Sequence, residues 1–204
     1  VRTFDIGADL NMFNDRLQFV FDWYNRTTVG MLGNGVELPS VVGAPAPLQN
    51  VSDMRTRGWE LSLSWHDKVG DFSYRAAFNL YDHVSKITKF NNATGNLKYH
   101  YEGEVLGEIW GYVNDGFYSI EDFVIEDARQ DKWVLRDGVT SINGYSPKPG
   151  DLKFVDLDGD NEITPGENTV TKPGDRRVIG NSTPRLEYGV NLGVAWRGLD
   201  LSVL

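Results

Sequence analysis

The sequence has no cysteine, only three histidines and no long apolar run, and each shortage excludes a class of protein. Without cysteine there is no disulfide framework, no thiolate metal cluster and no cysteine nucleophile. No stretch approaches the roughly 18 consecutive apolar residues of a membrane-spanning helix, although a β-strand span would escape that test. The formal net charge of -9 argues against a nucleic-acid partner.

Motifs for catalysis are missing as well. His66, His83 and His100 lie too far apart in sequence to suggest a metal motif. No serine lies in a G-x-S-x-G setting, and no glycine-rich loop suited to phosphate binding occurs. Carboxylate pairs such as Glu121-Asp122 are typical of a solvated face. The sequence therefore predicts a protein that is not an enzyme.

Six segments instead show apolar and polar residues in strict alternation, which is typical of β-strands with one apolar face. In the first segment, Phe4, Ile6, Ala8, Leu10 and Met12 share a face. The segments cover residues 3–12, 17–24, 59–66, 71–80, 186–196 and 199–203. Short turns at Asn14-Asp15, "DKVG" and Arg197-Gly198 join them in pairs. The prediction is an all-β fold, an antiparallel meander of about six strands in three hairpins.

The connections between hairpins are much longer than the turns within them. They run from about Thr28 to Asn50 and from about Ser85 to Pro184. Short turns alternating with long loops are typical of large outer-membrane β-barrels, whose strands are apolar outside and polar inside. Three regions follow: barrel strands in 1–85 with an outer loop near 28–50, a long acidic extracellular loop in 86–184, and a hairpin in 185–204. The alternative is a soluble β-sandwich.

Five stretches in this order carry a family resemblance: "RTRGWELSLSW", "GDFSYRAAFNLYDHVSKI", "GEIWGYVNDGFY", "PGDLKFVDLDGDNEI" and "DRRVIGNSTPRLEYGVNLGVAWRGLDLSVL". Together they resemble the C-terminal half of the barrel of SusC/RagA-type TonB-linked outer-membrane proteins. The resemblance implies a barrel of about 22 strands in the outer membrane of a Gram-negative bacterium. It also implies import of oligosaccharides or peptides, with a SusD-like surface lipoprotein and energy from TonB. The chain is expected to be a fragment that stops in mid-strand.

The long loop holds most of the negative charge, with 16 acidic and 5 basic residues between Tyr101 and Val170. Within it, "DLDGDNEITPGE" has the spacing of an EF-hand-type calcium loop. Asn161 stands where such loops need glycine, and asparagine tolerates the same left-handed backbone. The alternative is an acidic turn whose aspartates bind their own backbone amides. The predicted calcium ligands are Asp156, Asp158, Asp160, the carbonyl of Glu162, and Glu167.

Aromatic residues in the same loop raise a second hypothesis, that they stack on sugar rings at the mouth of a transporter. The candidate substrate contacts are Trp110, Tyr112, Tyr118 and Trp133. The alternative, which we favour, is that these rings form the loop's own small core.

Two hypotheses for the whole chain follow. In the first, the protein is a transporter segment in contact with lipid, and calcium stiffens one of its surface loops. The competing hypothesis is a soluble, calcium-dependent glycan-binding β-module.

Overall fold

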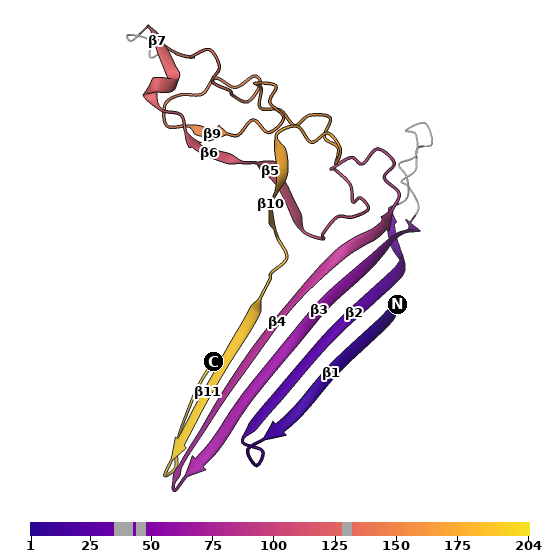
Figure 1. Ribbon diagram of the computed structural model, residues 1–204, viewed down its shortest axis with the longest axis vertical. Helices are drawn as coiled ribbons and strands as arrows, with labels where there is room; N and C mark the ends of the chain where they lie inside the picture. The colour runs from indigo at the N-terminus through magenta and orange to yellow at the C-terminus, as the bar shows by residue number, and fades with distance from the viewer. Residues whose placement is uncertain (35–42, 44–47, 128–131) are drawn as a thin grey trace. The chain divides into compact units, whose positions relative to one another are not determined.

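The computed structural model describes residues 1–34, 43, 48–127 and 132–204, and these form two compact units (Figure 1). The first unit is a six-stranded antiparallel sheet in the order β1-β2-β3-β4-β11-β12. Its strands are β1 (Arg2–Met12), β2 (Leu17–Asn34), β3 (Leu48–Val69), β4 (Phe72–Phe90), β11 (Glu187–Trp196) and β12 (Leu199–Val203). The predicted meander of three hairpins is confirmed.

The register of the sheet sorts its side chains into two faces. Leu63 of β3 pairs with Phe19 of β2 and with Phe78 of β4, and the same row continues to Leu10 and Val190. One residue along, Ser62 pairs with Val20 and Asn79, in a row that begins at Asp9 and ends at Gly189. Because successive side chains point to opposite faces, this register makes one face apolar and the other mainly polar.

The strands are longer than the alternation predicted. Strand β2 continues to Asn34 and β3 begins at Leu48, so much of the predicted loop near 28–50 is paired strand. Residues 35–42 and 44–47 of that loop lie outside the described residues. The apolar alternation fades after Thr28, but backbone ladder hydrogen bonds do not require an apolar face, and bulges absorb the irregular register.

The turns at Asn14-Asp15 and Arg197-Gly198 lie where the sequence placed them, and the turn between β3 and β4 is shifted. Arg197 and Gly198 both have positive φ angles, as the mirror-image two-residue turn of a hairpin requires. The turn between β3 and β4 is tighter than "DKVG", because β3 runs through Val69 and only Gly70 and Asp71 remain unpaired. Short turns therefore lie at one end of the sheet, and the long connections leave from the other.

The sheet has almost no interior of its own. Ile87 is its one large apolar residue buried among the described residues, while Phe4, Tyr188 and Leu199 are 62%, 75% and 70% exposed. Strands β1 and β12 each pair with one neighbour and form the two edges. Among the described residues, no helix is both long and apolar enough to cross a bilayer. The apolar face thus lacks a covering layer from the described chain.

The second unit comprises residues 92–101 and 107–182 and lies in the chain between β4 and β11. Its strands form three two-stranded antiparallel sheets, and a single turn of 3-10 helix, η2 (Ile120–Asp122), precedes β7. The strands are β5 (Glu108–Tyr112), β6 (Asn114–Phe117), β7 (Phe123–Asp127), β8 (Lys132–Leu135), β9 (Leu152–Phe154) and β10 (Arg176–Asn181). Tyr118, Phe123 and Ile163 are buried, so this unit has a core.

Candidate functional site

The aspartate-rich loop folds around its own backbone amides. The two carboxylate oxygens of Asp156 accept hydrogen bonds from the amides of Gly159 at 2.6 Å and Asn161 at 2.8 Å. Asn161 has a φ of 67°, the left-handed conformation predicted for it. These bonds are those of the alternative acidic turn. They leave lone pairs free on each oxygen, so they do not exclude a bound cation.

Asp175 is a member of this site that the sequence pattern did not indicate. Its side chain is completely buried, and its two oxygens accept hydrogen bonds from the amides of Leu157 and Thr164, both at 2.7 Å. Carboxylate oxygens of Asp156, Asp158 and Asp175 lie within 4.8 Å of one another. Calcium binds oxygen at about 2.3–2.6 Å, so oxygens on opposite sides of one ion are roughly 5 Å apart. The three carboxylates therefore fit a shared calcium ion.

The other predicted ligands have different partners. An oxygen of Asp160 accepts the amide of Glu162 at 2.8 Å. The carboxylate of Glu162, which was not the predicted ligand atom of that residue, accepts the side-chain amide of Asn143 at 3.3 Å. Glu167 forms an exposed ion pair with Lys172, with Oε1 and Nζ 2.5 Å apart. The group of three carboxylates thus includes two of the predicted side chains, Asp156 and Asp158, together with Asp175. The predicted calcium ligands stay a prediction.

The surroundings of the loop aspartates shift their pKa values in opposite directions. Partial desolvation and the negative charges of Asp160 and Asp175 raise the pKa of Asp158. The amides of Asn161 and Gly159 lower the pKa of Asp156, because they stabilise its ionised form. A divalent cation between these groups would relieve the repulsion on Asp158.

The backbones of two glycines, Gly166 and Gly174, lie in close contact next to Asp175. Gly166 and Gly174 have φ angles of 56° and 60°, and a Cβ atom on either would lie 2.5 Å from the backbone nitrogen of the other. The two backbones touch only because neither residue has a side chain. Asp175 follows Gly174 directly, and the amides of Leu157 and Thr164 hold its carboxylate.

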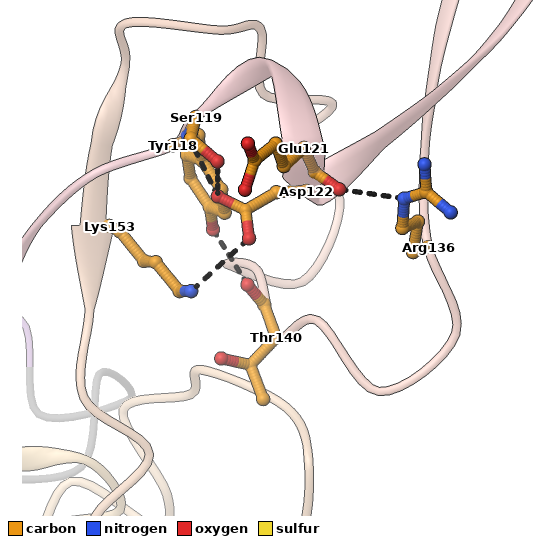
Figure 2. A network of polar contacts seen from close by, with 7 residues as sticks. All are labelled: Tyr118, Ser119, Glu121, Asp122, Arg136, Thr140 and Lys153. Atoms are coloured by element: carbon orange, nitrogen blue, oxygen red, sulfur yellow. Dashed lines mark hydrogen bonds and ion pairs between the residues drawn. The ribbon is translucent and has the colours of Figure 1, made fainter.

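Two of the four candidate aromatic contacts, Tyr118 and Trp133, belong to the core of the second unit. Tyr118 is 4% exposed, and its hydroxyl donates to the carbonyl of Thr140 at 2.7 Å (Figure 2). Its ring packs edge-on against Phe123, which in turn meets Trp133 at a centroid distance of 6.0 Å. Burial raises the pKa of the Tyr118 hydroxyl. These contacts support the favoured alternative for Tyr118 and Trp133, a structural core.

Polar contacts hold the segment around that core (Figure 2). The carboxylate of Asp122 accepts the amide of Ser119 at 2.7 Å and its hydroxyl at 3.1 Å, and Lys153 lies 3.7 Å from its other oxygen. Arg136 donates to the carbonyl of Glu121 at 2.6 Å. The amide of Ser119, its hydroxyl and Lys153 lower the pKa of Asp122.

The other two aromatic candidates lie along β5. Tyr112 packs on Phe154 with ring centroids 5.5 Å apart, and both residues are half-buried. The indole nitrogen of Trp110 is buried, and it has no hydrogen-bond partner among the described residues. A contact between Trp110 and substrate therefore stays a prediction.

The polar face of the sheet presents a third set of groups that a solute could meet. Ser62 of β3 donates to Asn79 of β4 at 2.7 Å, and Ser64 of β3 donates to Gln18 of β2 at 3.2 Å. Near the short turns, a hollow of about 210 Å³ is lined by His66, Ser73, Arg75 and Asp200 among others. The face offers both donors and acceptors, which suits polar solutes.

The fold and its two faces agree with what the sequence is similar to. A family model described as "TonB dependent receptor-like, beta-barrel" matches residues 1–197. The chain belongs to this family. Two TonB-dependent receptors of Formosa agariphila, P3 and P39, are 27% and 29% identical over 98% and 97% of the chain. The TonB-dependent receptor SusC of Bacteroides thetaiotaomicron is 24% identical over 91% of the chain.

Solved structures place the same fold in a known assembly. The RagAB peptide importer in its closed-closed state matches 98% of this chain with a TM-score of 0.64 and 23% identity, which shows the shared fold. The RagAB peptide transporter matches with a TM-score of 0.60 at 22% identity. The chain spans about a fifth of the length of these relatives, 18–21% of the curated sequences and 19–20% of the solved chains. This TonB-dependent receptor segment therefore corresponds to one sector of a larger barrel.

Proposed function

We propose that this chain forms part of the wall and one outer loop of an outer-membrane transporter for oligosaccharides or peptides. The observation that carries the proposal is the sheet itself, with an uncovered apolar face, a polar face and two unpaired edges. Large exposed apolar surfaces require lipid or a partner, and unpaired edges require further strands. A closed barrel in a membrane supplies both.

Import through the barrel would need partners outside this chain. One related structure is named a peptide importer, and the sequence resembles SusC/RagA-type proteins, which work with a SusD-like lipoprotein and TonB. We propose the same two partners for the full-length protein. The polar face would border the transport path, where serine, asparagine and glutamine side chains offer hydrogen bonds to sugar hydroxyls or peptide amides.

We also propose that Ca²⁺ binds the outer loop at Asp156, Asp158 and Asp175 and stiffens it. The support is the 4.8 Å grouping of the three carboxylates and the burial of Asp175. The ion would supply positive charge among carboxylates that otherwise repel one another. Asp156 and Asp175 would act as preorganised ligands, since backbone amides already fix their orientation.

The test of the transporter proposal uses the protein expressed from its complete reading frame. We expect it to fractionate with the outer membrane, to require detergent for extraction, and to migrate differently in electrophoresis before and after boiling. Uptake of labelled oligosaccharide and peptide libraries by cells with and without the gene would then identify the substrate class. A full-length protein that stays monodisperse in water without detergent would contradict the proposal and favour a soluble module.

A further inference from the structure

A group of three basic residues lies at the end of the sheet from which the long connections leave. Arg55 and Arg57 on β3 and Lys86 on β4 make up this basic rim. Arg57 and Arg55 lie two and four residues before Trp59, and alternation places all three on one face of the strand. Trp59 in turn shares the face of Leu61 and Leu63. The basic rim therefore lies on the apolar face of the sheet, at its border.

The arrangement of the basic rim is electrostatically unfavourable without an anion. Arg55 and Lys86 are directly opposite each other across β3 and β4, and like charges in that position destabilise a sheet. No described residue forms an ion pair with Arg55, Arg57 or Lys86. The nearby carboxylate of Asp82 is engaged by Arg185, whose guanidinium bonds both of its oxygens. A net positive charge remains.

A hollow of about 330 Å³ joins the basic rim to the apolar surface. It is lined by the three basic residues together with Trp23, Trp59, Asp82 and Val84 among others. Tryptophan has an apolar body and one polar group, which suits the boundary between lipid tails and headgroups. The same hollow thus offers contacts for a charged headgroup and for the first part of an acyl chain.

We propose that the basic rim binds the phosphate group of a lipid in the outer leaflet. The charge of the rim is complementary to phosphate, and arginine binds phosphate oxygens with two parallel hydrogen bonds. The acyl chains of the lipid would continue along the apolar rows below Trp23 and Trp59. This inference rests on the proposed membrane location, and it adds a specific lipid contact that anchors the upper border of the barrel.

The experiment compares the full-length receptor with its triple variant Arg55→Gln, Arg57→Gln, Lys86→Gln. The matched control is Arg26→Gln, which removes one positive charge at the same height, because Arg26 pairs with Thr56 on the opposite face. Delipidated protein is titrated with lipid A in detergent and bound lipid is counted by native mass spectrometry. Phosphatidylcholine serves as the probe whose headgroup is zwitterionic, with no net charge, and inorganic phosphate as the probe without acyl chains.

We expect roughly five-fold weaker lipid A binding for each basic residue lost, or about a hundredfold for the triple variant, and no change for Arg26→Gln. Equal binding of lipid A by the wild type and a folded triple variant would overturn the inference. Equal retention of inorganic phosphate by these two proteins would overturn it as well. If the triple variant does not fold, the single variant Lys86→Gln decides. A wild type that inserts into no bilayer would instead contradict the transporter proposal.

Discussion

The two units of this chain differ in whether their large apolar side chains are exposed or buried. In the sheet, the large apolar residues are exposed along one face, and Ile87 is the buried exception among those described. In the inserted unit, Tyr118, Phe123 and Ile163 are buried together with the charged side chain of Asp175. The difference teaches that the sheet depends on surroundings that the chain itself does not supply, whereas the insert carries its own small core.

Truncating the core of the insert is the change with the largest expected effect. Ile163 is 1% exposed, so Ile163→Ala should lower the free energy of unfolding of the insert by about 2–5 kcal/mol. The matched control Val124→Ala removes apolar atoms from a side chain that is 50% exposed, and its effect should be within about 0.5 kcal/mol. Hydrogen exchange of amides in 107–182 of the full-length protein measures both. Equal effects would show that the insert has no core of its own.

An arginine substitution on each face of the sheet tests whether the two faces have different surroundings. In a bilayer, Leu63→Arg should cost about 2–4 kcal/mol of folding free energy, because Leu63 lies in the middle of the apolar rows. Ser62→Arg puts the same charge on the neighbouring residue but on the polar face, and we expect a much smaller loss. Urea unfolding of the receptor in lipid vesicles measures the difference. Equal penalties at the two positions would contradict the assignment of Leu63 to a lipid-facing side of the sheet.

Calcium should stabilise the insert and leave the sheet unchanged. At a calcium concentration 100 times the dissociation constant, the expected gain is about 2.7 kcal/mol, which a chelator reverses. Asp175→Asn should abolish the gain because it removes a buried ligand, while Glu167→Gln should preserve it because Glu167 is paired with Lys172. Calorimetric titration of the variants with calcium gives the comparison. If Glu167→Gln lost calcium binding and Asp175→Asn kept it, Glu167 would be the ligand, as the sequence spacing predicted.

Lowering the pH should weaken calcium binding before it unfolds the loop. This is the smallest of the expected effects. The raised pKa of Asp158 means that it takes up a proton first as the pH falls, so calcium then competes with that proton. The lowered pKa of Asp156 means that its stabilising contribution is present above its usual pKa and is lost as the pH falls through the lowered value. Calcium titrations from neutral pH to about pH 4 test this order. Asp158→Asn should flatten the upper part of the profile.

Strict alternation was enough to predict the sheet, because a strand with one apolar face shows its period directly in the sequence. It failed at the ends, where Thr28 to Asn34 and Leu48 to Ser52 continue the ladder through backbone hydrogen bonds that leave no pattern in the side chains. The turn at Arg197-Gly198 was predictable because its positive φ angles select particular residues.

The loop site was only partly predictable, for a different reason. Asp156 and Asp158 are close in sequence, and their spacing indicated a shared centre. Asp175 is joined to the group by hydrogen bonds from the amides of Leu157 and Thr164, which are 18 and 11 residues away, and local spacing does not encode such contacts. The basic rim is similar, because Arg55 and Lys86 become neighbours only through the pairing of β3 with β4.

The most direct test of the central claim is the environment of consecutive residues in β3. The chain has no cysteine, so spin labels at Leu61, Ser62, Leu63 and Ser64 can be introduced one at a time in the full-length receptor, with any cysteines elsewhere replaced. In lipid vesicles, labels at Leu61 and Leu63 should be accessible to oxygen dissolved in the bilayer, and those at Ser62 and Ser64 to a water-soluble paramagnetic reagent. Accessibility of all four labels to the water-soluble reagent would contradict the account.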